Sequence, residues 1–197
     1  IRLRPDFAEA HNQLGLVLIQ SGDDDGGIAA LREAVRISPD YADAHDNLGA
    51  ALTPTNVKEA IAELEKAVAL APTSAKAQFN LAVMLLDGEG GPPDPKAGLQ
   101  WLQKSAAGGF ARAQYALGLL HERGELVPRS LTEATAWYRK AAEQGYRDAQ
   151  VSLATQYFLG RGAPRDYAEA ARWYERAAEQ GDPGAAYIVA SQYENGD

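Results

Sequence analysis

Histidine side chains are the first candidates for chemistry, because an imidazole can bind a metal ion or transfer a proton near neutral pH. The chain contains three of them, His11, His45 and His121. His11 and His45 are 34 residues apart and occupy equivalent positions of a repeated sequence unit. One repeat of separation is too far for a shared metal ion, so we expect packed or half-exposed histidines.

Other catalytic signatures are absent from the sequence. It has no cysteine, which excludes thiol nucleophiles and thiolate metal sites. It also has no His-Glu-x-x-His, Gly-x-Ser-x-Gly or Walker-type pattern. The stretch Gly160-Arg161-Gly162 follows a helical segment, whereas phosphate cradles lie at helix N-termini, so it predicts a turn. We therefore expect no enzyme activity, cofactor or metal ion in this chain, although a catalytic domain could lie outside it.

An acidic composition narrows the range of partners. The chain has 197 residues, a formal charge of −8 and a pI near 4.9, which argues against nucleic acid and anionic lipid. No apolar run is long enough to insert into a membrane. Residues 1–75 carry most of this negative charge, since they have 12 acidic and 6 basic side chains. The sequence leaves the compartment, cytoplasm or periplasm, open.

Two periods dominate the chain. Ala8-x-x-His11-x-x-Leu14-Gly15 recurs 34 residues later as Ala42-x-x-His45-x-x-Leu48-Gly49. From Ala75 onward the period becomes 36 residues, and three columns share it: Ala77, Ala113, Ala149 and Ala185; Trp101, Trp137 and Trp173; Gly109, Gly145 and Gly181. Repetition at this length is typical of stacked helical repeats.

Each repeat reads as two helices. Small and apolar residues recur at helical spacing over 111–121, and Gly124 provides a stop signal. A second helix is predicted over Leu131–Glu143, ended by Gly145. Proline in the loop between the two segments marks a turn.

These units resemble two related families. The 34-residue units are similar to tetratricopeptide repeats through their Leu-Gly, Ala and Pro landmarks, although His11 and His45 stand where tryptophan is common. The 36-residue units resemble Sel-one-like repeats, most clearly over Gly160–Gly181. The repeat that contains Trp137 departs from that pattern, because Leu126 replaces the second glycine of the loop and Ser130 replaces the aspartate.

The resemblance implies an all-α fold, a right-handed α-solenoid (superhelix) of stacked antiparallel helix pairs. The expected organisation is a tail of a preceding repeat over residues 1–7, two tetratricopeptide-like repeats over 8–74 and three Sel-one-like repeats over 75–182. Residues 183–197 would form the first helix of a truncated further repeat. All of these would belong to one continuous solenoid.

The same resemblance implies a non-catalytic scaffold or adaptor that binds a protein or peptide in its concave groove. The groove positions carried over from the tetratricopeptide pattern are Glu9, Asn12, Gln13, Leu16, Asp43, Asp46, Asn47, Ala50, Lys76, Phe79, Asn80 and Val83. Gln13, Asn47 and Asn80 share one repeat position and predict a short amide ladder, which could bond a peptide backbone or simply face water. Glu9, Asp43 and Asp46 could attract a basic segment or serve as a solvated face.

Other interpretations remain open at this stage. The solenoid could be a structural, self-associating array, or the regulatory arm of an enzyme outside this chain; our working expectation is a monomer. The acidic residues Asp23, Asp24 and Asp25 could complement the positive end of the following helix or loosely collect a cation, and the first is favoured. The tryptophan column could form a stacking platform, but aromatic residues at repeat spacing favour inter-helix core.

Overall fold

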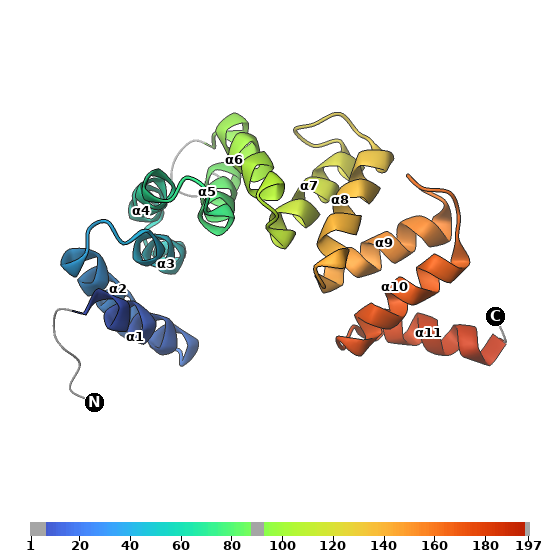
Figure 1. Ribbon diagram of the computed structural model, residues 1–197, viewed down its shortest axis with the longest axis horizontal. Helices are drawn as coiled ribbons and strands as arrows, with labels where there is room; N and C mark the ends of the chain where they lie inside the picture. Colours follow the sequence, from blue (N-terminus) through green and yellow to red (C-terminus); the bar gives the residue numbers. More distant parts are fainter. Residues whose placement is uncertain (1–6, 88–92, 196–197) are drawn as a thin grey trace. The chain divides into compact units, whose positions relative to one another are not determined.

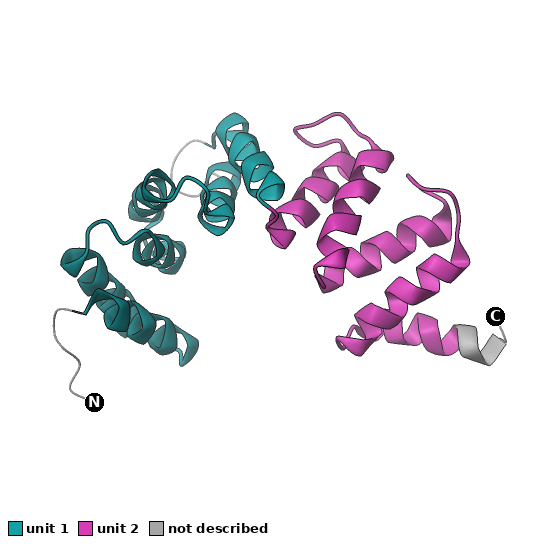
Figure 2. Ribbon diagram, in the orientation of Figure 1, with its two compact units in different colours: residues 1–108 teal, residues 109–197 magenta. Residues whose placement is uncertain are grey.

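The computed structural model describes residues 7–87 and 93–195, and all regular secondary structure in these residues is helical. The chain forms two compact units, residues 1–108 and 109–197 (Figure 2). The expected repeat tail over residues 1–7 and the last two residues of 183–197 lie largely or wholly outside the described part of the chain.

The described residues of unit 1 form three helix pairs (Figure 1). Its helices are α1 (Ala8–Gln20), α2 (Asp24–Ile37), α3 (Ala42–Leu52), α4 (Val57–Leu70), α5 (Ala75–Asp87) and α6 (Pro95–Ala107). Consecutive helices pack in pairs, and the first helices of neighbouring pairs, α1 with α3 and α3 with α5, also touch. These three helices form one side of the unit, which we call the first-helix face.

Unit 2 continues the same pattern of helix pairs. Its helices are α7 (Ala111–Arg123), α8 (Leu131–Glu143), α9 (Arg147–Leu159), α10 (Tyr167–Glu179) and α11 (Pro183–Asn195). Helix α7 pairs with α8, and α9 pairs with α10. Among the described helices, α11 has substantial contact with α10 alone.

Local sequence sets where the helices begin and end. The Asp23 carboxylate accepts a hydrogen bond from the Gly26 N–H at 2.9 Å and caps α2, so the acidic triplet complements the helix start, as favoured from the sequence. Gly124 ends α7 in the left-handed conformation, with φ of 76°. Leu126, where the family pattern has glycine, also keeps a positive φ of 61°.

Each second helix buries a large side chain between two small ones. The large position holds Leu31, Leu64, Leu102, Tyr138 and Tyr174, and all are at most 4% exposed. One turn before it lie Gly27, Ala60, Gly98, Ala134 and Ala170, and one turn after it lie Ala34, Ala67, Ser105, Ala141 and Ala177. The small residues let the two helices of a pair approach closely, and the large residue fills the centre of the pair.

Within each unit, the structure confirms the predicted fold class, an all-α solenoid of stacked antiparallel helix pairs. The predicted helix over Leu131–Glu143 matches α8. Continuity of the pairs as one solenoid along the whole chain stays a prediction.

We expect Gly49→Ala to lower the free energy of unfolding by about 1–3 kcal/mol, because overpacking a tight helix crossing forces its neighbours to move. An added Cβ at Gly49 would lie 2.6 Å from Leu64 Cγ and 3.0 Å from the Ala60 carbonyl oxygen. Urea unfolding of the full chain measures the loss.

Gly184→Ala serves as the control for this prediction. Its added Cβ would have Asp182 Oδ1 as its nearest neighbour, at 3.4 Å, and alanine favours a helix over glycine by up to about 1 kcal/mol. A Gly49→Ala variant as stable as wild type would contradict the packing described above.

Candidate functional site

Polar side chains on the first-helix face are bonded to one another across the repeats. Asn47 Nδ2 donates to Asn12 Oδ1 at 2.9 Å, and Lys76 Nζ donates to Asn47 Oδ1 at 2.9 Å. Asn12 and Asn47 are only 2% and 8% exposed. This chain of bonds ties α1, α3 and α5 together.

Asp46 is the second centre of this network. Its carboxylate is 4% exposed, pairs with Lys76 Nζ at 2.8 Å and accepts from Asn80 Nδ2 at 2.7 Å. Both carboxylate oxygens are therefore satisfied, and the buried charge has a counterion. We call Asn12, Asp46, Asn47, Lys76 and Asn80 the polar network.

The bonds of the polar network run diagonally across the repeat pattern. Asn12 bonds Asn47, 35 residues later, and Asp46 bonds Asn80, 34 residues later. Each spacing is one residue longer than the repeat itself. Each bond therefore joins a residue to the one that follows its equivalent in the next repeat. In unit 2 the Tyr115 hydroxyl is hydrogen-bonded to Ser152 in the same relative positions. The diagonal link is thus a recurring feature of first helices in this chain.

An acidic rim borders the polar network. Glu9, Gln13 and Asp43 are exposed, and none of them forms a hydrogen bond or ion pair with another residue that the structure describes. Burial raises the pKa of Tyr41, and the carboxylates of Asp43 and Glu9 raise it further. We call Glu9 and Asp43 the acidic rim.

Between α3 and α5 the same face is hollowed. The hollow has a volume of about 680 Å³ and is lined by Ala50, Thr53, Pro54, Leu64, Phe79, Asn80, Val83 and Met84. Most of these side chains are apolar, while Asn80 links the hollow to the polar network. A hollow of this kind suits an apolar side chain whose backbone lies across the polar residues.

A buried histidine supports α3 from behind. His45 is 4% exposed, and its ring nitrogens lie 2.5 Å from Glu63 Oε2 and 2.9 Å from the Pro39 carbonyl oxygen. The ring thereby joins α4 to the turn that contains Pro39. Burial raises the pKa of Glu63, but hydrogen bonds from Lys66 and His45 outweigh that effect and hold the pKa below its usual 4.5.

The structure sorts the sequence-predicted groove residues into three groups. Asn12, Asp46, Asn47, Lys76 and Asn80 come together in the polar network. Ala50, Phe79 and Val83 line the hollow, and Glu9, Gln13 and Asp43 stay exposed. Leu16 is half-buried.

Two features of this face differ from the sequence expectation. Two members of the predicted amide ladder hydrogen-bond within the protein, Asn47 with Asn12 and Lys76, and Asn80 with Asp46. Asp46 is a buried, paired carboxylate rather than an open one. Thr53, Pro54, Leu64 and Met84 also line the hollow but are not among the groove positions predicted from the sequence. The sequence signal for an unusual turn near Pro54 is the spacing of 33 residues from Leu31 to Leu64, where Ala8 and Ala42 are 34 apart.

The other sequence candidates lie in structural surroundings. His45 is packed and His11 half-buried, as expected. Trp173 is core, while Trp101 and Trp137 are half-buried beneath Lys104 and Lys140. Within the described residues, no three metal-ligating side chains gather and no helix could cross a membrane.

Comparison with known proteins identifies the repeats. The Sel1 repeat pattern matches residues 75–110, 111–146 and 147–182, which is more than half of the chain. The chain belongs to the Sel1 repeat family. The tetratricopeptide (TPR) repeat pattern also matches, over residues 15–53. No curated protein matches the chain.

Solved structures with this fold come from several bacteria. A Sel1 repeat protein from Oxalobacter formigenes is 27% identical, with a TM-score of 0.80, over 94% of this chain and 55% of that one. The protective antigen c5321 of uropathogenic Escherichia coli is 30% identical, with a TM-score of 0.76, over 86% of this chain and 36% of that one. Pseudomonas aeruginosa pilF is 22% identical, with a TM-score of 0.70, over 95% of this chain and 84% of that one, and shows the fold alone.

These matches establish the general role of the repeats. Sel1 and TPR repeats serve in general as protein–protein interaction scaffolds and are typically non-catalytic. The chain spans about half of the Oxalobacter protein (55%) and about a third of the Escherichia protein (36%).

We expect Lys76→Met to destabilise the chain by about 1–3 kcal/mol, because it leaves the buried Asp46 carboxylate without a counterion. The loss is smaller than for a fully buried pair because the Lys76 side chain is 55% exposed. Adding Asp46→Asn should restore part of the stability, since a neutral amide needs no counterion, whereas Asn47 Oδ1 still lacks its donor from Lys76. A double-mutant cycle by urea unfolding tests this; purely additive losses would contradict the pairing.

Acid should weaken the support of α3 through Glu63. Because its pKa is lowered in the folded state, its contribution to stability is complete above about pH 4.5 and is lost as the pH falls through the folded value. We expect Glu63→Gln to lose less stability than wild type between about pH 6 and about pH 3.5. Urea unfolding at the two pH values measures the difference, and parallel losses would rule out this role of Glu63.

Proposed function

We propose that unit 1 binds an extended peptide segment of a partner protein on its first-helix face. One apolar side chain of that segment would enter the hollow between α3 and α5, and a basic residue would lie near the acidic rim. The observation that carries the proposal is the presence of the hollow and the rim on one face, on either side of the polar network.

Most of the polar network positions this site rather than binding the peptide itself. The amides of Asn12 and Asn47 are buried and bonded within the protein, so they hold the three helices in register. Two polar groups remain for a peptide backbone: the exposed Gln13 amide and Asn80 Oδ1, which accepts no hydrogen bond from the described residues. An amide can bond a backbone of any sequence.

The acidic rim supplies selectivity by charge. Glu9 and Asp43 are exposed and unpaired among described residues, whereas Asp46 is neutralised by Lys76. Lysine or arginine in a partner segment would thus meet two open carboxylates at one end of the face. Exposed charges of this kind raise the association rate, and salt weakens their effect.

Selection from a random peptide library on the full chain tests the proposed function. We expect recovered peptides to combine an apolar residue with lysine or arginine. Ala50→Trp, which fills the hollow from an exposed position on α3, should weaken their binding by at least about tenfold.

Ala62→Trp is the matched control, because Ala62 is an exposed alanine on α4 outside the hollow. Its affinity should stay within about twofold of wild type. Circular dichroism checks that both variants fold. Equal binding by Ala50→Trp and Ala62→Trp would place the peptide elsewhere and contradict the proposal.

A further inference from the structure

Unit 2 carries a second hollow, on the side of its second helices. The hollow has a volume of about 470 Å³, and its walls come from α8 and from the loop between α9 and α10. Its lining residues are Thr132, Thr135, Ala136, Arg139, Lys140, Gly162, Ala163 and Pro164. The volume falls within the range of roughly 300–1,000 Å³ found for ligand pockets.

The loop wall of this hollow is held firmly on α8. Gly162 has a φ of 71°, and an added Cβ would lie 2.1 Å from the Leu131 carbonyl oxygen and 2.4 Å from Thr135 Oγ1. Only glycine fits this contact. Thr135, 3% exposed, donates to the Leu131 carbonyl at 2.9 Å and lies 3.4 Å from that of Arg161. The close contact between this loop and α8 thus fixes the shape of the hollow.

Two cations line the hollow without an acidic partner. Neither Arg139 nor Lys140 forms an ion pair with a carboxylate in the described part of the chain. Aromatic rings hold them instead: Arg139 donates to the Tyr157 hydroxyl and lies 5.7 Å from that ring centre, and Lys140 Nζ lies 3.9 Å from the Trp137 ring centre.

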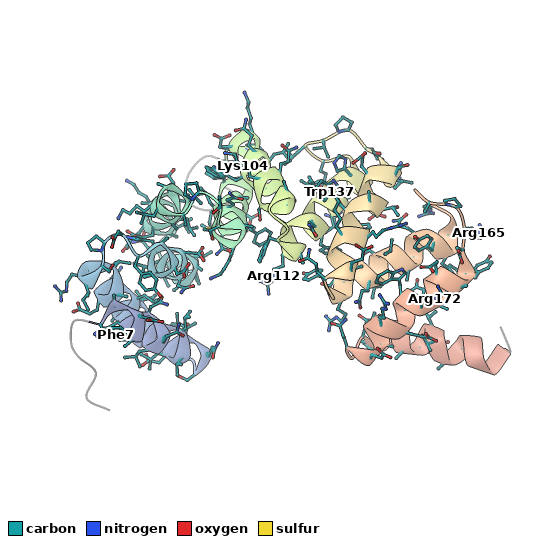
Figure 3. All side chains as sticks on the ribbon, viewed as in Figure 1. Phe7, Lys104, Arg112, Trp137, Arg165 and Arg172 are labelled. Carbon is teal, nitrogen blue, oxygen red and sulfur yellow. The ribbon has the colours of Figure 1, made fainter. Side chains whose placement is uncertain are left out.

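Contact with a ring fixes a cation without neutralising it. Arg139 and Lys140 therefore keep their charge and most of their N–H donors for a ligand. Arg172 and Arg147 of unit 2 do pair with carboxylates, at 2.7 Å from Glu169 and 3.4 Å from Asp148. Arg176 and Arg165 lie over the rings of Trp173 and Tyr167, but neither lines the hollow. Trp137, Arg165 and Arg172 of this unit are labelled in Figure 3.

We propose that this hollow binds an acidic peptide segment. Carboxylates of glutamate or aspartate would meet Arg139, Lys140 and the exposed Thr132, whose hydroxyl has no hydrogen bond to another described residue. Ala136, Ala163 and Pro164 would contact the methylene groups of the same side chains. The site lies wholly within unit 2 and does not depend on the function proposed for unit 1.

Fluorescence anisotropy with a short fluorescein-labelled peptide of alternating alanine and glutamate tests the proposal on the full chain. The net charge of −8 repels this probe, so its binding has to come from a local cationic site. We expect Arg139→Gln with Lys140→Gln to weaken binding about tenfold. Ala136→Trp should weaken it by a similar factor, because it fills the hollow from an exposed position without changing the charge.

Two matched variants keep the test specific. Arg147→Gln with Arg172→Gln removes the same charge outside the hollow, and Ala168→Trp adds the same ring on an exposed part of α10. Both should bind within about twofold of wild type. No binding to wild type, unchanged binding by the lining variants, or equal losses in the matched variants would overturn the proposal. Binding of inorganic phosphate alone as tightly as the peptide would overturn the assignment to a peptide.

Discussion

The close approach of two helices within each pair is the constraint on which the rest of the molecule depends. Every second helix has small residues one turn before and one turn after a single large one, as in Ala60, Leu64 and Ala67. In the α3–α4 pair, glycine on the first helix meets that large residue, since a Cβ on Gly49 would collide with Leu64. Because apolar burial within a pair uses these few positions, the opposite face of the first helix is left for other contacts.

On unit 1 that face combines polar and apolar contacts. Buried amides and the Asp46–Lys76 pair join α1, α3 and α5, and the hollow opens beside them. A satisfied polar network specifies one arrangement of side chains more strictly than apolar packing does. The face is therefore prepared in the free protein, which lowers the entropic cost of binding a segment there.

The repeated pattern allowed the fold to be predicted from the sequence, whereas the contacts within the site could be identified only from the structure. Each helix and stop signal appears several times, so the pattern predicts α8 and the turn at Gly124. Asn12 and Gln13 are neighbours on one helix face, and spacing alone cannot show that Asn12 is buried and Gln13 exposed. The diagonal links and the burial of Asp46 depend on how one repeat is displaced against the next.

The proposed function depends on the hollow between α3 and α5 receiving an apolar side chain of a partner peptide. Met84 lines this hollow and is the chain's single methionine, so a protein labelled with ¹³C at the methionine methyl gives one resonance from the site. Adding a peptide selected on the wild-type chain should shift that resonance in proportion to the fraction bound. A peptide that binds while the Met84 resonance stays unmoved would contradict the claim.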